Sequence, residues 1–170
     1  MASQHRHSII VSFTFNTYVA QGMKVMSGSM EPTIAVNDRL FVEKVEPASQ
    51  YAFGDIVVFY PPVPGQETEH YVKRLIGLPG DTIEVKNGTL YRNGAAVQEP
   101  YMKDKINYSY GPVTVPENQY FFLGDNRNDS LDSHLWKDKD GNPVPFVDKS
   151  RVIGKVMFRY YPLPALGGLK

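Results

Sequence analysis

Short runs of β-branched and aromatic residues, separated by turn-forming residues, dominate the middle of the chain. Such runs predict strands, because branched and aromatic side chains suit a pleated, half-buried surface. No apolar period of 3.6 residues persists for three turns, and no fixed-period repeat occurs. The pattern therefore predicts a mostly β protein with antiparallel or mixed sheets. The expected strands cover residues 9–19, 39–45, 55–60, 71–78, 119–123 and 152–161.

Two Asn-Gly pairs predict a hairpin region by their turn chemistry. Asn87-Gly88 and Asn93-Gly94 lie within residues 82–97, with four residues between the pairs. Asn-Gly is the preferred type I′ hairpin turn, because both central residues must adopt positive φ. We therefore expect a three-stranded meander, within a small hairpin insert over residues 82–118. The tyrosine-rich residues 100–116 are expected to be irregular.

Composition narrows the chemistry more than the fold. The 170 residues suit one domain, and 18 basic against 18 acidic side chains leave no net charge to attract nucleic acid. The absence of cysteine excludes disulfides, thiolate-bound zinc and thiol nucleophiles. Asp138 and Asp140 lack the later Glu of a calcium-binding loop. We expect neither a metal nor a cofactor, so any catalysis must use oxygen and nitrogen side chains.

The beginning of the chain is apolar-rich but short. Residues 9–19 fall well short of the roughly 20 apolar residues of a membrane span, and they lack the three-part pattern of a secretory signal. This stretch is either a first β-strand or the remnant of a membrane anchor. The chain accordingly divides into a leader or anchor remnant at 1–17, a main domain at 18–165 and a tail at 166–170.

Three polar clusters stand out, at residues 27–33, at Lys73-Arg74 and at residues 124–134. Without cysteine, covalent catalysis would use Ser, Thr, Lys or a carboxylate. Ser29 follows a glycine that lets the backbone approach a substrate, which suits an exposed hydroxyl beside free N–H groups. The same segment alone is equally compatible with an ordinary Ser/Gly/Pro loop.

Lys73 is the second candidate, because strand alternation turns it to the same face as Tyr71 and Leu75. A lysine on an apolar face either extends to solvent or is buried. Burial lowers the pKa of an amine, and only a neutral amine accepts a proton. A neutral lysine beside a serine hydroxyl would form a base and nucleophile without histidine. The alternative is a surface lysine next to Arg74.

Taken together and in order, these clusters resemble the motifs of type I signal peptidases. The matching segments are Ser-Gly-Ser-Met-Glu-Pro-Thr (27–33), Asp-Arg-Leu-Phe-Val-Glu-Lys (38–44), Gly-Asp-Ile-Val-Val-Phe (54–59), Tyr-Val-Lys-Arg-Leu-Ile-Gly-Leu-Pro-Gly-Asp (71–81) and Gly-Asp-Asn-Arg-Asn-Asp-Ser-Leu-Asp-Ser-His (124–134). The resemblance runs from about residue 18 to 161, and the final histidine resembles the cyanobacterial and plastid branch. It implies a signal-peptidase-like fold and a membrane-bound Ser/Lys protease, with residues 18–165 as the catalytic domain.

The resemblance also implies roles for individual residues. Ser29 resembles the nucleophile and Lys73 the general base. Ser27 would offer its hydroxyl to the oxyanion, together with the backbone N–H of Ser29. Ser130 resembles the hydroxyl that orients the lysine amine, and Asp132 resembles the carboxylate that braces its loop.

The partner of Asp132 differs from much of the family, where an arginine stands two residues further on. Here that position is His134, and Arg127 and Lys155 are alternative partners. Met26 is a second departure, because the family usually has proline there. Neither departure removes a catalytic group.

Substrate specificity is expected to come from shallow apolar pockets, because signal peptides end in an Ala-x-Ala-like site. The substrate would lie extended beside residues 23–26 and 71–73, held by backbone hydrogen bonds. Plain core packing is the alternative role for the pocket residues. The resemblance implies that the pocket residues are Val25, Ile34, Leu40, Tyr71 and Val72.

The expected partners are signal peptides of exported preproteins and a membrane surface, without nucleic acid; the sequence does not indicate an oligomeric state. The catalytic domain would lie on the extracytoplasmic side, at the periplasmic face of the plasma membrane or in the thylakoid lumen. An exposed apolar patch is expected near residues 9–15 and the pockets.

Three other functions are the alternatives to signal-peptide cleavage. A self-cleaving repressor-type Ser/Lys protease would usually carry a DNA-binding domain, and this chain has neither a helix-turn-helix pattern nor a basic arm. A catalytically silent relative that binds exported chains would not need every matched catalytic position. A simple binding β-barrel would need none of the motifs.

Overall fold

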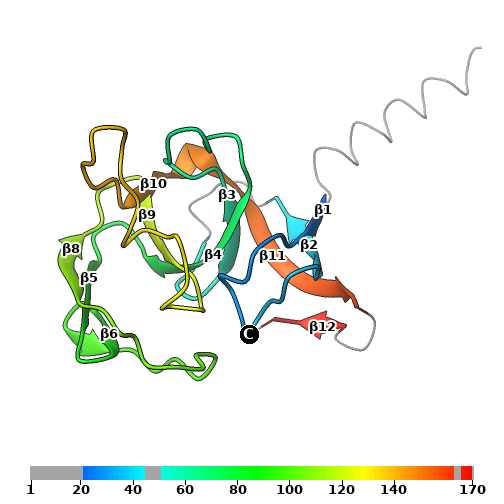
Figure 1. The fold of residues 1–170 in the computed structure, drawn as a ribbon, viewed down its shortest axis with the longest axis horizontal. Coiled ribbons are helices and arrows are strands. Elements are labelled where there is room, and N and C mark those ends of the chain that lie inside the picture. The colour runs from blue at the N-terminus through cyan, green and yellow to red at the C-terminus, as the bar shows by residue number, and fades with distance from the viewer. Residues whose placement is uncertain (1–20, 45–50, 163–165, 170) are drawn as a thin grey trace, which may run out of the picture.

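The computed structural model describes residues 21–44, 51–162 and 166–169. These residues form two antiparallel sheets, one large and curved and one small; in Figure 1 the small sheet lies at the left, and the large sheet extends from beside it to the right. The prediction of a mostly β protein with antiparallel or mixed sheets is therefore confirmed, and the strand pairings among the described residues are antiparallel. The expected strand at residues 9–19 and the leader at 1–17 lie outside the described residues.

The larger sheet contains most of the segments that resemble the family's motifs. Its long strand β11 (Val152–Tyr161) pairs with β3 (Ile56–Phe59) near its start and with β2 (Arg39–Glu43) from Lys155 onward. Register shifts in both pairings let the sheet curve. In sheet order its strands are β1 (Gln21–Lys24), β2 (Arg39–Glu43), β11 (Val152–Tyr161), β3 (Ile56–Phe59), β4 (Tyr71–Gly77), β9 (Gln119–Leu123) and β10 (Phe146–Asp148), with β12 (Gly167–Gly168) beside β11.

The smaller sheet is built from strands that all lie within residues 82–114. Its order is β7 (Ala95–Ala96), β6 (Thr89–Arg92), β5 (Thr82–Lys86) and β8 (Tyr110–Thr114). Both Asn-Gly pairs adopt the positive φ angles expected of type I′ turns, 52° and 78° at the first pair and 52° and 80° at the second. The predicted three-stranded meander is confirmed.

The strands predicted from long apolar runs are confirmed as β2, β3, β4, β9 and β11, whereas short or interrupted strands escaped prediction. β8 lies in the segment predicted to be irregular and includes Gly111-Pro112, residues that normally mark turns. β10 and β12 contain only three and two residues. Gly167 and Gly168 therefore pair with β11 instead of belonging wholly to a tail. Among the described residues the only helix is the 3₁₀ turn Lys149–Arg151.

Three apolar clusters form the core. The first lies beneath the turn that carries Ser29 and includes Met30 and Ile34. The second is aromatic, with Phe59 stacked on Phe122 at a ring separation of 4.1 Å. The third joins the two sheets, because Phe121 of the larger sheet packs with residues of the smaller one. The smaller sheet is thus attached to the larger one through a shared core.

We expect Phe59→Ala to destabilise the protein strongly. Phe59 is fully buried within the aromatic cluster, so its truncation should lower the free energy of unfolding by about 3–5 kcal/mol. Phe158→Ala is the matched control, because Phe158 is 37% exposed and stacks mainly on Phe41. Its cost should be only about 1 kcal/mol. Urea denaturation measures both values, and equal losses would contradict this assignment of the core.

Candidate active site

Ser29 lies in the turn between β1 and β2. Glu31 N–H donates to the Gly28 carbonyl at 3.1 Å, and Ile34 N–H donates to the Met30 carbonyl at 3.0 Å. The side chains of Met30 and Ile34 are buried in the first core cluster. The turn is therefore anchored from below, which keeps the Ser29 hydroxyl at the surface of a cavity.

A second segment holds this turn from the side. The loop of residues 124–134, named the 124–134 loop, follows β9 directly. Asn126 donates from its backbone N–H to the Ser29 carbonyl at 3.0 Å, and from its side chain to the Gly28 carbonyl at 3.1 Å. Gly124 leaves room for this approach, because a Cβ at this position would lie only 2.5 Å from the backbone carbonyl oxygen of Ser29. A side chain at position 124 would therefore separate the two segments.

Lys73 meets Ser29 from β4. Its Nζ lies 2.5 Å from the Ser29 Oγ, and Lys73 is only 4% exposed. Burial lowers the pKa of Lys73 from 10.5 to about 8, although the charge of Asp132 acts in the opposite direction. Removal from water thus brings the pKa of this amine closer to neutral pH. The amine also lies 5.4 Å from the Tyr71 ring, which confirms that the two side chains share one face of the strand.

Ser27 and Ser130 both lie beside this pair, with different contacts. The Ser27 hydroxyl is on the exposed part of the turn and donates to the Ser29 Oγ at 3.3 Å. The Ser130 hydroxyl is buried and has no hydrogen-bond partner among the described residues. It lies against Gly124, where a Cβ would be 2.1 Å from the Ser130 Oγ. Ser130 is therefore at the site, but it does not hydrogen-bond Lys73 in this structure.

Asp132 braces the 124–134 loop from inside. It is fully buried, and its Oδ2 accepts a hydrogen bond from the Gly124 N–H at 3.0 Å. Its other oxygen contacts His134 Nδ1 and accepts the His134 backbone N–H at 3.2 Å. Of the three partners considered from sequence, His134 is the one in contact. Arg127 instead pairs with Glu99, and Lys155 pairs with Asp55.

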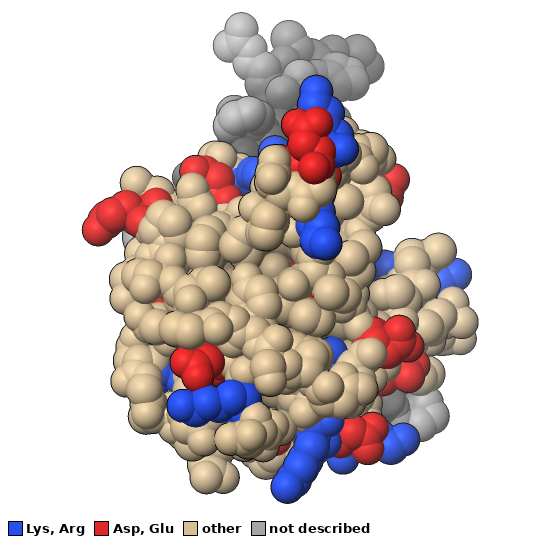
Figure 2. Space-filling view, turned by 60° about the vertical axis from the view of Figure 1, so that its left-hand side comes forward, with Lys and Arg blue, Asp and Glu red and all other residues tan. Residues whose placement is uncertain are grey.

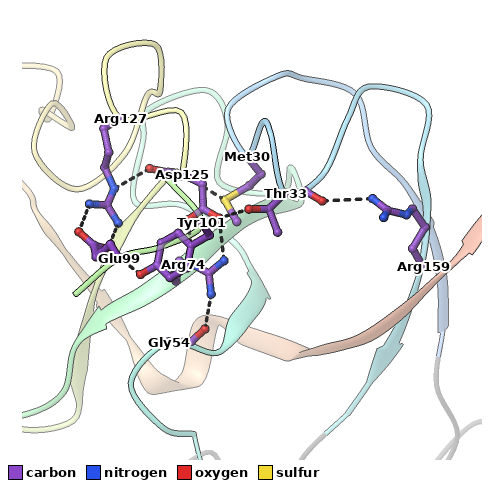
Figure 3. A network of polar contacts seen from close by, with 10 residues as sticks. Met30, Thr33, Gly54, Arg74, Glu99, Tyr101, Asp125, Arg127 and Arg159 are labelled. Carbon is purple, nitrogen blue, oxygen red and sulfur yellow. Dashed lines mark hydrogen bonds and ion pairs between the residues drawn. The ribbon is translucent and has the colours of Figure 1, made fainter. Parts of the chain in front are cut away.

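A buried ion pair connects the strand of Lys73 to the 124–134 loop. Arg74 donates to both oxygens of Asp125, at 2.8 and 2.7 Å, and to the Gly54 carbonyl at 2.8 Å. Asp125 also accepts the Thr33 hydroxyl at 2.5 Å and donates its backbone N–H to the Met30 sulfur at 3.4 Å. Figure 3 shows Asp125 between Arg74, Thr33 and Met30. One carboxylate therefore joins β4, the Ser29 turn and the 124–134 loop.

A cavity of about 680 Å³ opens onto the Ser29 hydroxyl and the Lys73 amine. Four of the five predicted pocket residues line it, namely Val25, Ile34, Tyr71 and Val72. Leu40 does not: it is fully buried in the first core cluster, so its assignment to the pocket was wrong. Alternation along β2 turns Leu40 inward, and membership of a matching motif does not distinguish core from pocket.

The rim of the cavity combines apolar and polar side chains. Met26 is 79% exposed and Leu131 is 44% exposed, and both line the opening. The polar side chains of Gln66, Glu69 and His70 line the same cavity, and the Tyr71 hydroxyl donates to the Gln66 side chain. The sequence analysis missed this polar rim, because residues 61–69 carry only the signals of a loop. On the face in Figure 2, charged groups of both signs stand around a broad area with few charges.

In the described part of the chain, no group of three His, Asp or Glu side chains is arranged to hold a metal ion. The same residues include no helix long and apolar enough to cross a membrane. What the cavity does offer is a hydroxyl in contact with an amine whose pKa is lowered. Such a pair can transfer the hydroxyl proton to nitrogen while the oxygen attacks an electrophilic carbonyl.

Known proteins resemble this chain along most of its length. The family described as "Signal peptidase, peptidase S26" matches residues 4–161. A probable signal peptidase I-2 of Synechocystis is 39% identical over 94% of this chain and 72% of its own length. The signal peptidase I of Leptolyngbya laminosa is 37% identical over 95% of this chain and 79% of its own length. The signal peptidase I of Bacillus licheniformis is 41% identical over 91% of this chain and 81% of its own length.

We expect the burial of Lys73 to make folding stability depend on pH. Because the pKa of Lys73 is about 8 when folded and 10.5 in the reference state, the unfolded chain binds more protons between these pH values. Stability therefore rises with pH across that window, by up to about 3 kcal/mol. Lys73→Met lacks this dependence, so the difference in unfolding free energy between the two proteins should favour wild type increasingly towards pH 10.5. Denaturation series at several pH values measure it; a constant difference would contradict a buried, neutralised amine.

Proposed function

This chain belongs to the signal peptidase family, peptidase S26, and we propose that it removes signal peptides from exported preproteins with Ser29 as nucleophile and Lys73 as general base. Its class is that of the signal peptidase I enzymes, which are serine endopeptidases. The observation that carries the assignment of residues is the 2.5 Å contact between the Lys73 amine and the Ser29 hydroxyl.

The first half of the reaction forms an acyl-enzyme. The neutral Lys73 amine accepts the Ser29 hydroxyl proton as the Oγ attacks the carbonyl carbon of the scissile bond. The resulting tetrahedral intermediate collapses when the lysine ammonium returns this proton to the departing amine. The signal peptide is then esterified to Ser29, and the mature protein leaves with a new amino terminus.

The second half repeats the same proton transfer with water. Lys73 accepts a proton from a water molecule as the hydroxide attacks the ester, and it returns the proton to the Ser29 oxygen when the ester breaks. The signal peptide leaves with a free carboxylate. A single amine therefore serves as base and acid in both halves, which requires a pKa near the working pH.

Ser27 would stabilise the negative charge that develops on the carbonyl oxygen. Its hydroxyl lies 3.3 Å from the Ser29 Oγ, so a carbonyl attacked by Ser29 would come within its reach together with the Ser29 N–H. One such donor contributes about 3–4 kcal/mol to transition-state stabilisation. Ser130 would orient the amine after a change of its side-chain rotamer, and Asp132 would keep the 124–134 loop in place.

The cavity supports an extended substrate with small side chains next to the cut. Residues of β1 and β4 both line it, and β1 is an edge strand that pairs only with β2 among the described residues. A peptide could therefore add backbone hydrogen bonds while its side chains enter the cavity. Ile34 and Val72 are buried and line the cavity, so their side chains would oppose substrate groups larger than alanine.

A membrane would present the substrate to this cavity. Met26 and Leu131 are exposed apolar side chains at its opening, as expected of a site that receives signal peptides at a lipid surface. We propose that the catalytic residues face the extracytoplasmic side, in the periplasm or the thylakoid lumen. No observation favours the repressor-type protease or the silent relative.

We expect the wild-type protein to cleave a signal-peptide substrate after the second alanine of Ala-x-Ala. Ser29→Ala and Lys73→Ala should each lower kcat by at least about 10⁴-fold, because the two groups act as one unit. The wild-type rate should rise with pH around an apparent pKa near 8, as Lys73 loses its proton. Mass spectrometry of the products with initial rates in detergent measures both; full activity in Lys73→Ala would refute the dyad.

The pocket assignment gives a separate expectation. Ile34→Ala enlarges the cavity and should reduce the preference for Ala over Val before the cut by about tenfold. Leu40→Ala is the matched control, because Leu40 is equally buried but does not line the cavity. The ratio of kcat/KM for the two substrates is the measurement. If both variants changed this ratio equally, the selectivity would not come from the pocket.

A further inference from the structure

The segment between β7 and β8, residues 98–109 and here named the strap, crosses from the smaller sheet to the 124–134 loop. It contacts that loop at three separate points. Glu99 pairs with Arg127, the Asn128 side chain bonds the backbone at residues 105 and 107, and Tyr108 stacks on His134 at 3.8 Å. The strap is therefore attached along the length of the loop that holds Ser29.

Glu99 makes the strongest of these contacts. Both of its oxygens accept hydrogen bonds from the Arg127 guanidinium, at 2.6 and 2.5 Å. The side chains of Glu99 and Arg127 are 5% and 1% exposed, respectively. Burial alone lowers the pKa of Arg127, but the hydrogen bonds and charge of Glu99 raise it on balance. Removal of the Glu99 charge would leave a cation buried without its partner, which is strongly unfavourable.

Arg127 connects Glu99 to the Ser29 backbone through the turn of residues 124–127. Its Nε donates to the Gly124 carbonyl at 2.9 Å, which closes the turn of residues 124–127. Within that turn, the Asn126 N–H donates to the Ser29 carbonyl at 3.0 Å. The position of the Ser29 backbone thus depends on a turn whose closing residue is held by Glu99.

Tyr101 reaches the general base by a second route. Its ring covers the Arg74 guanidinium at 3.7 Å, and its hydroxyl donates to Glu99 at 2.6 Å. Arg74 follows Lys73 in β4 and forms the buried pair with Asp125. Figure 3 shows Glu99 and Tyr101 together against the two arginines. One pair of strap residues therefore contacts both the strand of the base and the loop of the nucleophile.

We propose that Glu99 and Tyr101 are positioning residues for the reaction, which hold the Ser29 turn and the Lys73 strand at the separation that proton transfer requires. The proposal rests on the proposed roles of Ser29 and Lys73. Neither strap residue touches the substrate cavity, so they act only through Arg127 and Arg74. The smaller sheet then contributes to catalysis, because it anchors both ends of the strap.

The test compares Glu99→Gln and Tyr101→Leu with matched controls on the smaller sheet. Glu84 and Tyr91 are paired neighbours on β5 and β6, and both contact Lys86, away from the 124–134 loop. Glu84→Gln and Tyr91→Leu therefore remove the same chemical groups from a site without a role in positioning. Each variant is assayed for kcat, KM and its pH–rate profile at a temperature where denaturation curves show it folded.

We expect Glu99→Gln and Tyr101→Leu to lower kcat by about tenfold or more, because small misplacements of reacting groups are costly. KM should stay within about threefold of wild type, since the cavity keeps its lining. The apparent pKa of the rising limb should move above about 8, as water gains access to Lys73. The controls should stay within about twofold of wild type. Tyr101→Phe removes only the bond to Glu99 and should give a smaller loss.

A second measurement is independent of any substrate. The Lys73 amine can be titrated by NMR through its Cε resonance, assigned by its loss in Lys73→Met. Asp132 on the 124–134 loop and Tyr71 on the same strand face this amine, and both remain in every variant. Glu99→Gln and Tyr101→Leu should raise the pKa of Lys73, whereas Glu84→Gln and Tyr91→Leu should not.

The outcomes separate the two proposals. If wild type cleaves and folded Glu99→Gln and Tyr101→Leu keep its kcat and its Lys73 titration, the positioning role is wrong. A loss of activity that merely follows the unfolded fraction would also overturn it, because the strap would then be only structural. If wild type cleaves no signal peptide, the proposed function fails, while the Lys73 titration still decides whether the strap controls the amine. Should Glu99→Gln fail to fold, Tyr101→Leu and Tyr101→Phe give the same decision.

Discussion

The contact between one amine and one hydroxyl sets the requirements that the surrounding fold must meet. An amine can accept the Ser29 proton only when it is partly deprotonated, and in this protein that state is reached by burial. Burial in turn requires a rigid environment, because a mobile lysine would extend to water. Lys73 stands within a seven-residue strand that pairs with β3 on one side and β9 on the other. The central position of β4 in the sheet is thus part of the chemistry.

Ser29, the proposed nucleophile, lies in a turn instead of a strand, and polar and charged side chains support that turn. The turn of Ser29 is joined to the rest of the molecule by Asp125 and Asn126, and these depend on Arg74 and Arg127 in turn. Buried ion pairs contribute little net stability compared with apolar residues of the same size, but they are costly to break. Their value here lies in fixing one arrangement of three segments that are distant in the sequence.

The amino-acid sequence predicts the parts of this structure that depend on local pattern. Long apolar strands and the Asn-Gly turns were identified correctly, and Lys73 was placed on the face of Tyr71 by alternation alone. Contacts between distant segments were not predictable, since nothing near Glu99 indicates a partner 28 residues later. The assignment of Leu40 to the pocket was wrong for another reason, because an apolar residue in a matching motif fits a core and a pocket equally well. The hydroxyl direction of Ser130 is a rotamer choice, which residue types do not encode.

If Lys73 is the general base, the depth at which it is buried also determines what fraction of the molecules can react at any moment. With a pKa of about 8, roughly one molecule in ten carries an uncharged lysine at pH 7, and about half do so one unit higher. Deeper burial would enlarge this ready population but would weaken the amine as a proton acceptor. Shallower burial would leave the lysine protonated in almost every molecule. Under the proposed mechanism, the acidity of the compartment would therefore set the fraction of molecules that are able to react.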